Sequence, residues 1–418
     1  MTISSKLLSS YGYKLGLTLL GITKGVLLAR LLGPTGRGVF ALAAVVQSTA
    51  LRVASLGQNT AVIHFSSRSP NSIEQIFFNC IWQGIVVGGL VATITGLVGL
   101  LLPSIPLPWI VMSAVVFSIP VILTYDLTRG LLLGKQNVDA FNHFELVAQL
   151  TSVLTLAVCG FSIVLQPAAA IVLAQIFPAC VALLLVCRSL GFGARKLQSF
   201  NWHLATTMCR FGARAGIVSI LVFAISEVNI LLISHQLGMA EAGYYALAQK
   251  ATVAFSALTL PLTQILLPHL SSADLGNDSE GNWRLVQRSA AAVATMSAGV
   301  CLVLVGAIRP IITLLYGEDF LPAAVPCLIM SASQIFETAT SIILAYLASA
   351  GFPTTVVKIL TVTFCMELGL SYELIAFNQV NGAATSYLVS QIVTLVLLYR
   401  HSSDLHLSRN ARSSSTVS

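Results

Sequence analysis

The stretch LGPTGRGVFALA at residues 32–43 recurs in this chain as LGMAEAGYYALA at residues 237–248. The two copies align without a gap, and the distance from Gly33 to Gly238 is 205 residues. The same register extends to HFSS at residues 64–67 and HLSS at residues 269–272. Chance similarity between apolar segments rarely keeps Gly, an aromatic residue, His and a Ser pair in one register. The repeat therefore indicates that the chain is built from two related halves.

The chain is far more apolar than a soluble protein. Of its 418 residues 56% are hydrophobic and 9% are charged, with a mean hydropathy of +0.87. A helix needs about 20 apolar residues to cross a bilayer, so about a dozen spans fit this length. In the first half, apolar runs predict helices at residues 12–32, 39–63, 76–102, 109–133, 144–165 and 168–187. The second half predicts helices at residues 215–236, 242–267, 285–308, 322–349, 355–377 and 382–400.

Six helices per half is an even number, so both copies of the repeat enter the membrane in the same direction. Parallel repeats are typical of transporters that carry the substrate between two lobes. We therefore expect an all-α polytopic membrane protein with two six-helix lobes related by a parallel pseudo-two-fold repeat. The expected domains are an N-terminal lobe at residues 1–187, a basic linker at 188–214, a C-terminal lobe at 215–400 and a disordered tail at 401–418.

The net charge of +7 has a topological explanation. Most of the 22 Lys and Arg residues fall on the termini and on the connections of one side of the predicted helices, whereas the other side has only Arg30, Arg37 and Arg309. Under the positive-inside rule both termini and the basic linker are cytoplasmic. The linker, which carries no acid, would lie on an anionic inner leaflet of the membrane. This charge pattern argues against nucleic-acid binding.

Cofactor and metal chemistry find no support in the sequence. The eight Cys residues form no C-x-x-C pair, and most sit in apolar runs, as buried packing residues do. The seven His residues are scattered without ligand spacing. We expect no metal, no cofactor and no enzymatic activity.

Three cations lie where the bilayer core should be. Lys24, Arg52 and Lys250 fall inside predicted apolar helices. A charge at this depth costs at least about 3 kcal/mol on insertion scales, so such residues face a protein-lined interior and mark transport pathways. Because these charges are basic, the sequence favours transport of an anion. The alternative is that each charge is neutralised in an interhelical salt bridge, for instance with Glu227.

Polar residues extend from these cations along the helices. Ser48, Arg52, Ser55 and Asn59 have the spacing of one helical face, and Arg30 lies at the outer end of the first helix. A matching stripe on the predicted helix 242–267 has Lys250 at its edge, and its members are Gln249, Thr252, Ser256, Thr259 and Thr263. We take Lys24, Arg30, Arg52, Asn59 and Lys250 as candidate substrate-binding residues.

Three carboxylates also lie within predicted helices. Glu227, Glu337 and Glu367 each have Ser, Thr, Asn or Gln residues on the same helical segment. An acid inside a membrane can couple transport to H⁺ or Na⁺. It can equally be a hydrogen-bonded packing group, and the sequence leaves these two interpretations open.

Three motifs in the correct order resemble a known family. They are LLARLLGP…GRGVF at residues 27–40, LYG…F…AA at residues 315–324 and QVNGAA at residues 379–384. These resemble the first hairpin, the loop into the tenth helix and the start of the last helix of polysaccharide-type flippases in the multidrug/oligosaccharidyl-lipid/polysaccharide (MOP) exporter superfamily. The similarity spans essentially the whole chain.

The resemblance implies export of an oligosaccharide linked to a polyprenyl diphosphate, by alternating access through a basic cavity. Lys24 and Arg52 stand at the positions where the lipid II branch of the family has diphosphate-coordinating arginines. Lys24 departs from that pattern, because lysine lacks the bidentate fork of arginine. The chain also lacks the two extra helices of that branch, which favours an O-antigen, capsule or exopolysaccharide unit over lipid II.

The expected partners are the lipid-linked oligosaccharide, membrane lipids and the polymerase or glycosyltransferases of the same polysaccharide. Two other functions compete with this one. A cation-coupled multidrug exporter of the same superfamily would be expected to have carboxylates at the cavity centre, whereas this set of residues is mainly basic. A membrane-embedded polysaccharide polymerase would need a sizeable outer loop with acid/base residues, and the outer connections are short.

Overall fold

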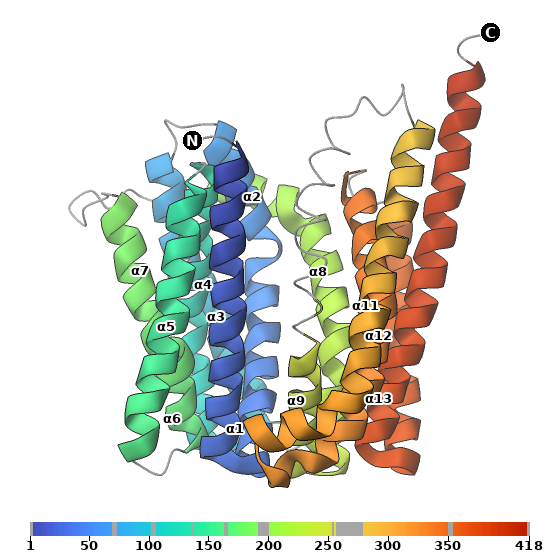
Figure 1. Ribbon diagram of the computed structural model, residues 1–418. Helices are drawn as coiled ribbons and strands as arrows, with labels where there is room; N and C mark the ends of the chain where they lie inside the picture. The colour runs from blue at the N-terminus through green and yellow to red at the C-terminus, as the bar shows by residue number, and fades with distance from the viewer. Residues whose placement is uncertain are drawn as a thin grey trace. The chain divides into compact units, whose positions relative to one another are not determined.

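The computed structural model describes residues 3–68, 73–101, 106–135, 137–162, 166–190, 200–252, 255, 279–349 and 354–415, and it is helical almost throughout (Figure 1). The helices of the first half are α1 (Ile3–Ser55), α2 (Gln58–Arg68), α3 (Ile73–Leu101), α4 (Trp109–Gly134), α5 (Val138–Ser162), α6 (Pro167–Ile171), a π-helix (Val172–Ile176) and α7 (Phe177–Leu190). Those that follow are α8 (Trp202–Gln236), α9 (Met239–Ala251), α11 (Ser279–Leu315), a 3₁₀ helix (Glu318–Ala323), α12 (Ala324–Ser349) and α13 (Thr354–Ser415). No strand occurs in these ranges.

The chain is a multi-pass membrane protein. Within the described residues, 9 helical segments are long and apolar enough to cross a bilayer. Two of them, Gly16–Ser55 and Thr354–His406, each cover two of the predicted spans, because a break divides the helix. The predicted helix 242–267 is described only to Ala251, apart from Thr252 and Phe255, so most of it, with Ser256, Thr259 and Thr263, lies outside the described residues.

The contacts divide the chain into two compact units. The first unit comprises Met1–Phe223 and Leu237–Gly243, and the second comprises Ala224–Gln236 and Tyr244–Ser418. The helix α8 therefore contributes its first part to one unit and its last part to the other. In the first unit α3 packs on α4, and α5 packs on α1 and α7. In the second unit α11 packs on α12, and α12 packs on α13.

Two of the helix boundaries that differ from the prediction change the expected domain limits. The helix predicted to start at residue 215 begins at Trp202, so residues 202–214 of the predicted linker are helical, while 191–199 lie outside the described residues. Asn201 caps this helix by accepting a hydrogen bond from Leu204 N at 3.0 Å, and it exchanges two bonds with the buried Asn79 of α3. At the other end of the chain α13 continues past residue 400 to Ser415, and His406 stacks on Trp283 there.

The predicted helix 39–63 is broken in the middle. Leu56 and Gly57 have φ of 41° and 75°, which ends α1 at Ser55 and starts α2 at Gln58. Asn59 therefore does not continue the helical face of Ser55, and the predicted single stripe is wrong at this residue. The break lets α8 approach closely, because a Cβ on Gly57 would collide with the backbone of Gly212 and Gly216. Position 57 therefore needs glycine for two reasons, its positive φ and its close contact with the backbone of α8.

The repeated stretch has the same local structure in both copies. Gly33 and Gly238 both have positive φ, 65° and 113°, and each ends one helical arm before the next begins. Phe40 and its counterpart Tyr245 are both buried, with 5% and 0% of their surface exposed. The equivalence that the sequence predicts therefore extends to backbone conformation and to burial.

The two turns also contact each other, within the first unit, through a pair of equivalent glycines. A Cβ on Gly38 would overlap the carbonyl oxygen of Met239, and a Cβ on Gly243 would overlap the carbonyl oxygen of Pro34. Gly243 is the repeat counterpart of Gly38, and Met239 is that of Pro34, so the contact is reciprocal. Backbone meets backbone here, and any side chain at either glycine would force the turns apart.

This glycine contact predicts a matched pair of mutational effects. Gly38→Ala and Gly243→Ala should each destabilise the protein by about 1–3 kcal/mol, the usual cost of overpacking. Thermal unfolding in detergent would measure both. Gly21→Ala is the control, because nothing lies within 4 Å of its Cβ and alanine favours a helix. Unfolding of Gly38→Ala at the temperature of Gly21→Ala would contradict the close contact.

Candidate functional site

Lys24 donates a hydrogen bond to a backbone carbonyl group that lacks the N–H donor of a regular helix, because a proline occupies the donor's position. Its Nζ donates to the backbone oxygen of Ala174 at 2.7 Å, and Ser152 Oγ donates to the same oxygen at 2.9 Å. Ala174 lies in the π-helix, four residues before Pro178. Because proline has no N–H, the helix cannot supply the ordinary hydrogen bond to this oxygen. The ammonium group thus satisfies a main-chain acceptor in the middle of a membrane-spanning segment.

Arg52 lies against α8. Its Nη1 donates to Ser219 Oγ at 2.6 Å, and its guanidinium carbon lies 4.3 Å from the centre of the Phe223 ring. A cation over an aromatic face is stabilised by the ring quadrupole, which partly replaces the water lost in the membrane. The side chain remains partly exposed. An arginine held in this way has a fixed orientation.

The other predicted substrate-binding residues lie elsewhere. Arg30 is exposed on the first arm of α1, and Asn59 is exposed in the first turn of α2. Lys250 is exposed in the last turn of α9 and belongs to the second unit, whereas Lys24 and Arg52 belong to the first. Their convergence on one site remains a prediction.

The second unit contains a buried polar cluster centred on Glu367. Oε1 of Glu367 accepts hydrogen bonds from Asn229 Nδ2 at 2.7 Å and from Ser371 and Ser386 at 3.1 Å each. Asn229 also donates to the Tyr245 hydroxyl at 2.9 Å and to Ala383 O at 3.3 Å. Glu367, Asn229, Ser371 and Ser386 are all 0% exposed. Four helical segments, α8, α9 and the two arms of α13, meet at this carboxylate.

One oxygen of this carboxylate has no hydrogen-bond partner. Oε2 of Glu367 is buried and unsatisfied. A buried ionised oxygen in this condition is strongly destabilising unless it carries a proton or faces a cation. The same cluster contains hydroxyl, amide and main-chain oxygens of Ser371, Asn229 and Ala383, and such oxygens are the ligands that hard cations prefer. The cluster is therefore chemically suited to hold H⁺ or a small cation.

Glu337 belongs to a neighbouring part of the same arrangement. Its Oε2 accepts hydrogen bonds from Tyr387 at 2.8 Å and from Gln334. Tyr387 follows Ser386 directly in the sequence, so adjacent residues of α13 bind the two carboxylates. Glu227 lies on α8 two residues before Asn229 and is partly exposed.

The sequence analysis identified Glu367 and Glu337 but not all their partners. The 205-residue offset of the repeat places Asn229 opposite Lys24, but the sequence does not connect Asn229 with Glu367, and it does not single out Tyr245, Ser386 or Tyr387. The same position of the repeat therefore holds a deep polar group in both halves.

Because Lys24 bonds to the oxygen that Pro178 leaves without a donor, substitutions of Lys24 and Pro178 should be coupled. Lys24→Met should destabilise the protein by about 1.5–3 kcal/mol, as loss of a charge-assisted hydrogen bond does. Pro178→Ala restores an N–H that can bond to Ala174 O, so Lys24→Met should cost much less in that background. A double-mutant cycle of thermal unfolding measures the difference. Pro120→Ala is the control proline, and its effect should add to that of Lys24→Met. If the effects of Lys24→Met and Pro178→Ala on unfolding were additive, this would contradict the contact between Lys24 and the Ala174 oxygen.

Comparisons with known proteins agree on fold and family. The structure is similar to the lipid II flippase MurJ in an inward closed conformation, with a TM-score of 0.74 and 11% identity over 96% of this chain and 90% of that one. It is similar to an inward-facing multidrug resistance MATE family transporter of the MOP superfamily, with a TM-score of 0.68 and 12% identity over 96% and 95% of the two chains. It is also similar to a MOP superfamily transporter from Pyrococcus furiosus that is described as having a binding pocket of reverse polarity, with a TM-score of 0.66 and 11% identity over 97% of this chain and 94% of that one.

No curated protein sequence matches the chain. At these identities the three structures establish the fold alone, which is that of MurJ and the MATE transporters. A family model described as "polysaccharide biosynthesis protein" matches residues 27–325, which is well over half of the chain. The chain belongs to this polysaccharide biosynthesis protein family, with the fold of the MOP superfamily.

Proposed function

We propose that this protein is a flippase that moves an oligosaccharide repeat unit, linked to a polyprenyl diphosphate, across the bacterial cytoplasmic membrane. The observation that carries the proposal is the pair of cations, Lys24 and Arg52, within the membrane-spanning α1 of a MOP-fold protein from a polysaccharide family. A diphosphate is the anionic part of such a substrate. The MurJ neighbour, named as a lipid II flippase, supports a lipid-linked substrate.

The geometry of the two cations suits stepwise transfer of a diphosphate. Lys24 exchanges its bond to a carbonyl oxygen for a bond to a phosphate oxygen, and Ser152 continues to satisfy Ala174. Arg52 is oriented by Ser219 and Phe223 and presents N–H donors in a planar fork, which matches phosphate geometry. In this proposal the diphosphate and glycan cross through a basic central cavity to which Arg30, Asn59 and Lys250 contribute. The polyprenyl tail stays in the lipid.

We further propose that Glu367 couples this step to H⁺ or Na⁺. A proton on Oε2, or a cation among the surrounding oxygens, would satisfy the one unpaired atom of the cluster. Its release would leave a buried negative charge and favour a different packing of α8 against α13, which is the two-state element that coupling requires. Glu337 and Glu227 are the secondary candidates for this role.

The proposed cellular setting follows the charge pattern of the sequence. Both termini and the linker between the halves are on the cytoplasmic side, where a lipid-linked unit for O-antigen, capsule or exopolysaccharide is made. The glycosyltransferases or polymerase of that polysaccharide are the expected partners. The protein itself forms and breaks no covalent bond.

The first test is charge reversal at Arg52. Arg52→Glu should abolish surface polysaccharide in cells that depend on this protein, while the amount of protein in the membrane is unchanged. The purified variant should also bind polyprenyl diphosphate at least about tenfold more weakly by native mass spectrometry, as loss of a charge-assisted phosphate contact predicts. Arg309→Glu, an exposed arginine of α11, is the matched control. Normal polysaccharide with Arg52→Glu would refute the role of this residue.

The second test separates coupling from binding. Glu367→Gln is permanently neutral and should lower surface polysaccharide at least about tenfold, because the side chain can no longer change charge. Binding of polyprenyl diphosphate to the purified variant should stay within about twofold of the original. Glu373→Gln, an exposed carboxylate on the same helix, should have no effect. A fully active Glu367→Gln variant would leave Glu367 as a packing group.

The competing function is a cation-coupled multidrug exporter, which the MATE neighbours and the buried carboxylates of the second unit favour. It predicts that removing the gene lowers tolerance to cationic drugs and leaves the surface polysaccharide intact. The flippase proposal predicts the reverse result for both measurements.

A further inference from the structure

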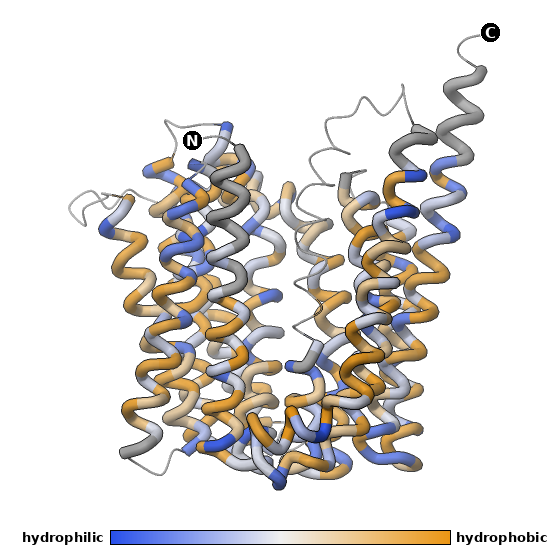
Figure 2. The backbone as a smooth tube through the Cα atoms, viewed as in Figure 1, coloured by the Kyte–Doolittle hydropathy of each residue, from blue (hydrophilic) through white to orange (hydrophobic). Residues whose placement is uncertain are grey.

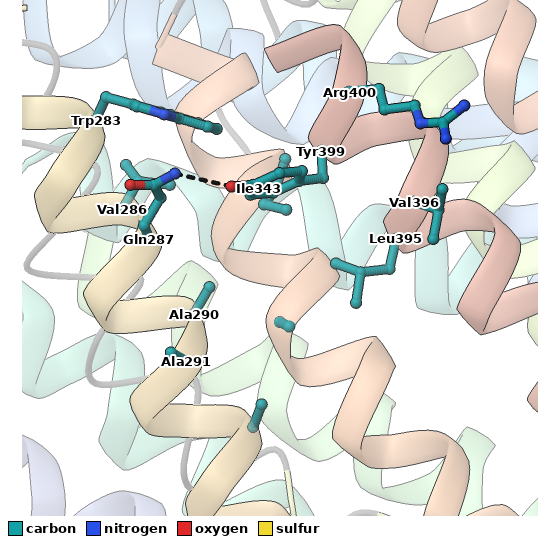
Figure 3. A pocket seen from close by; sticks show the side chains of 12 residues that line it. Trp283, Val286, Gln287, Ala290, Ala291, Ile343, Leu395, Val396, Tyr399 and Arg400 are labelled. Atoms are coloured by element: carbon teal, nitrogen blue, oxygen red, sulfur yellow. Dashed lines mark hydrogen bonds between the residues drawn. The ribbon is translucent and has the colours of Figure 1, made fainter. Parts of the chain in front are cut away.

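A groove of about 600 Å³ lies within the second unit, between α11, α12 and α13 (Figure 3). One end is polar and aromatic, where Gln287 Nε2 donates to the Tyr399 hydroxyl at 2.8 Å beside Trp283, and Arg400 extends from α13 in the direction away from this pair. The rest is lined by small and branched apolar side chains, including Ala291 and Ala294. The groove is thus amphipathic, with a polar end and an apolar channel.

The groove runs from the edge of a membrane-spanning segment toward its centre. Trp283 is the first residue of the apolar segment Trp283–Leu315, and Tyr399 lies close to the end of Thr354–His406. Trp and Tyr with both apolar and polar edges are characteristic of the membrane interface. From Trp283 to Ala294 the helix rises about 16 Å at 1.5 Å per residue, so the apolar part reaches into the hydrocarbon region.

The charge of the groove selects its occupant. Arg400 is the one charged residue among the described residues that line the groove, and none of these residues is an acid. Arg284 and Arg288 are exposed on α11 at the same end. A phosphate beside Arg400 would meet its guanidinium group, while an acyl chain would fill the space beside the alanines.

We propose that this groove binds an anionic phospholipid of the bilayer, with one acyl chain along Ala291 and Ala294 and the phosphate at Arg400. The bound lipid joins α11 to α13, so it stabilises the packing of the second unit. Anionic lipids of the cytoplasmic leaflet are attracted to basic groups at the membrane surface. The inference needs only the membrane location of the chain and is independent of the transported substrate.

Tryptophan fluorescence tests this proposal in the full-length protein. Trp82, Trp109 and Trp202 are replaced by Phe, and the remaining Trp283 reports on the groove in vesicles that contain phospholipids with brominated acyl chains. A brominated anionic phospholipid should quench Trp283 at a mole fraction about fivefold lower than a brominated zwitterionic one. This is the preference expected from one arginine near the membrane surface. Equal quenching by the two lipids would overturn the assignment of the phosphate site.

Paired variants locate the lipid within the groove. Ala291→Phe fills the channel at an exposed position and should reduce the quenching at least about twofold, whereas Ala292→Phe, exposed but outside the lining, should not. Arg400→Gln should abolish the preference for the anionic lipid, and Arg309→Gln should keep it. Native mass spectrometry of the protein with all four tryptophans should show retained anionic lipid that Arg400→Gln loses. Displacement of the brominated lipid by an isoprenyl phosphate at equal concentration would overturn the choice of occupant.

Discussion

The dominant constraint on this molecule is that the bilayer core offers no hydrogen-bond partner to a polar group. Every deep polar atom must be satisfied by the protein, or it costs several kcal/mol. At Ala174 the chain creates such an atom, because Pro178 removes the donor that a regular helix would supply. Lys24 and Ser152 satisfy it. One contact thereby explains two exceptions: the lysine, which violates the rule against buried charge, and the proline, which breaks the helix.

The second unit meets the same constraint with side chains alone. One oxygen of Glu367 accepts hydrogen bonds from Asn229, Ser371 and Ser386, and the other oxygen has no partner. Figure 2 shows polar residues among the apolar ones along the helices. Asn229 is the repeat counterpart of Lys24, so the same position of the repeat holds a cation in one half and an amide in the other. In the proposed mechanism the first unit handles the anion and the second exchanges a proton or cation.

Hydropathy was sufficient to predict the membrane spans that the structure describes, because lipid imposes a long apolar signal on every helix, and three short motifs predicted the family. The break at Leu56 and Gly57 was missed, since positive φ at a glycine inside an apolar run leaves no mark in composition. It displaces Asn59 from the face of Arg52. The contact of Asn229 with Glu367 was equally hidden, because the two residues are 138 positions apart in the sequence. The acceptor for Lys24 is a backbone oxygen, and the identities of the side chains do not predict it.

The glycine contact between Gly38 and Gly243 shows what the repeat preserves. The cations and carboxylates have diverged between the halves, yet the two turns keep a positive φ and a reciprocal backbone contact that excludes every side chain. At the deep positions of the helices the two halves hold different polar residues, since one polar residue can replace another if its hydrogen bonds are met. The two turns keep the same glycines, because a side chain at either one would force the backbones apart. Within this chain the halves are therefore alike at their turns and differ along their helices.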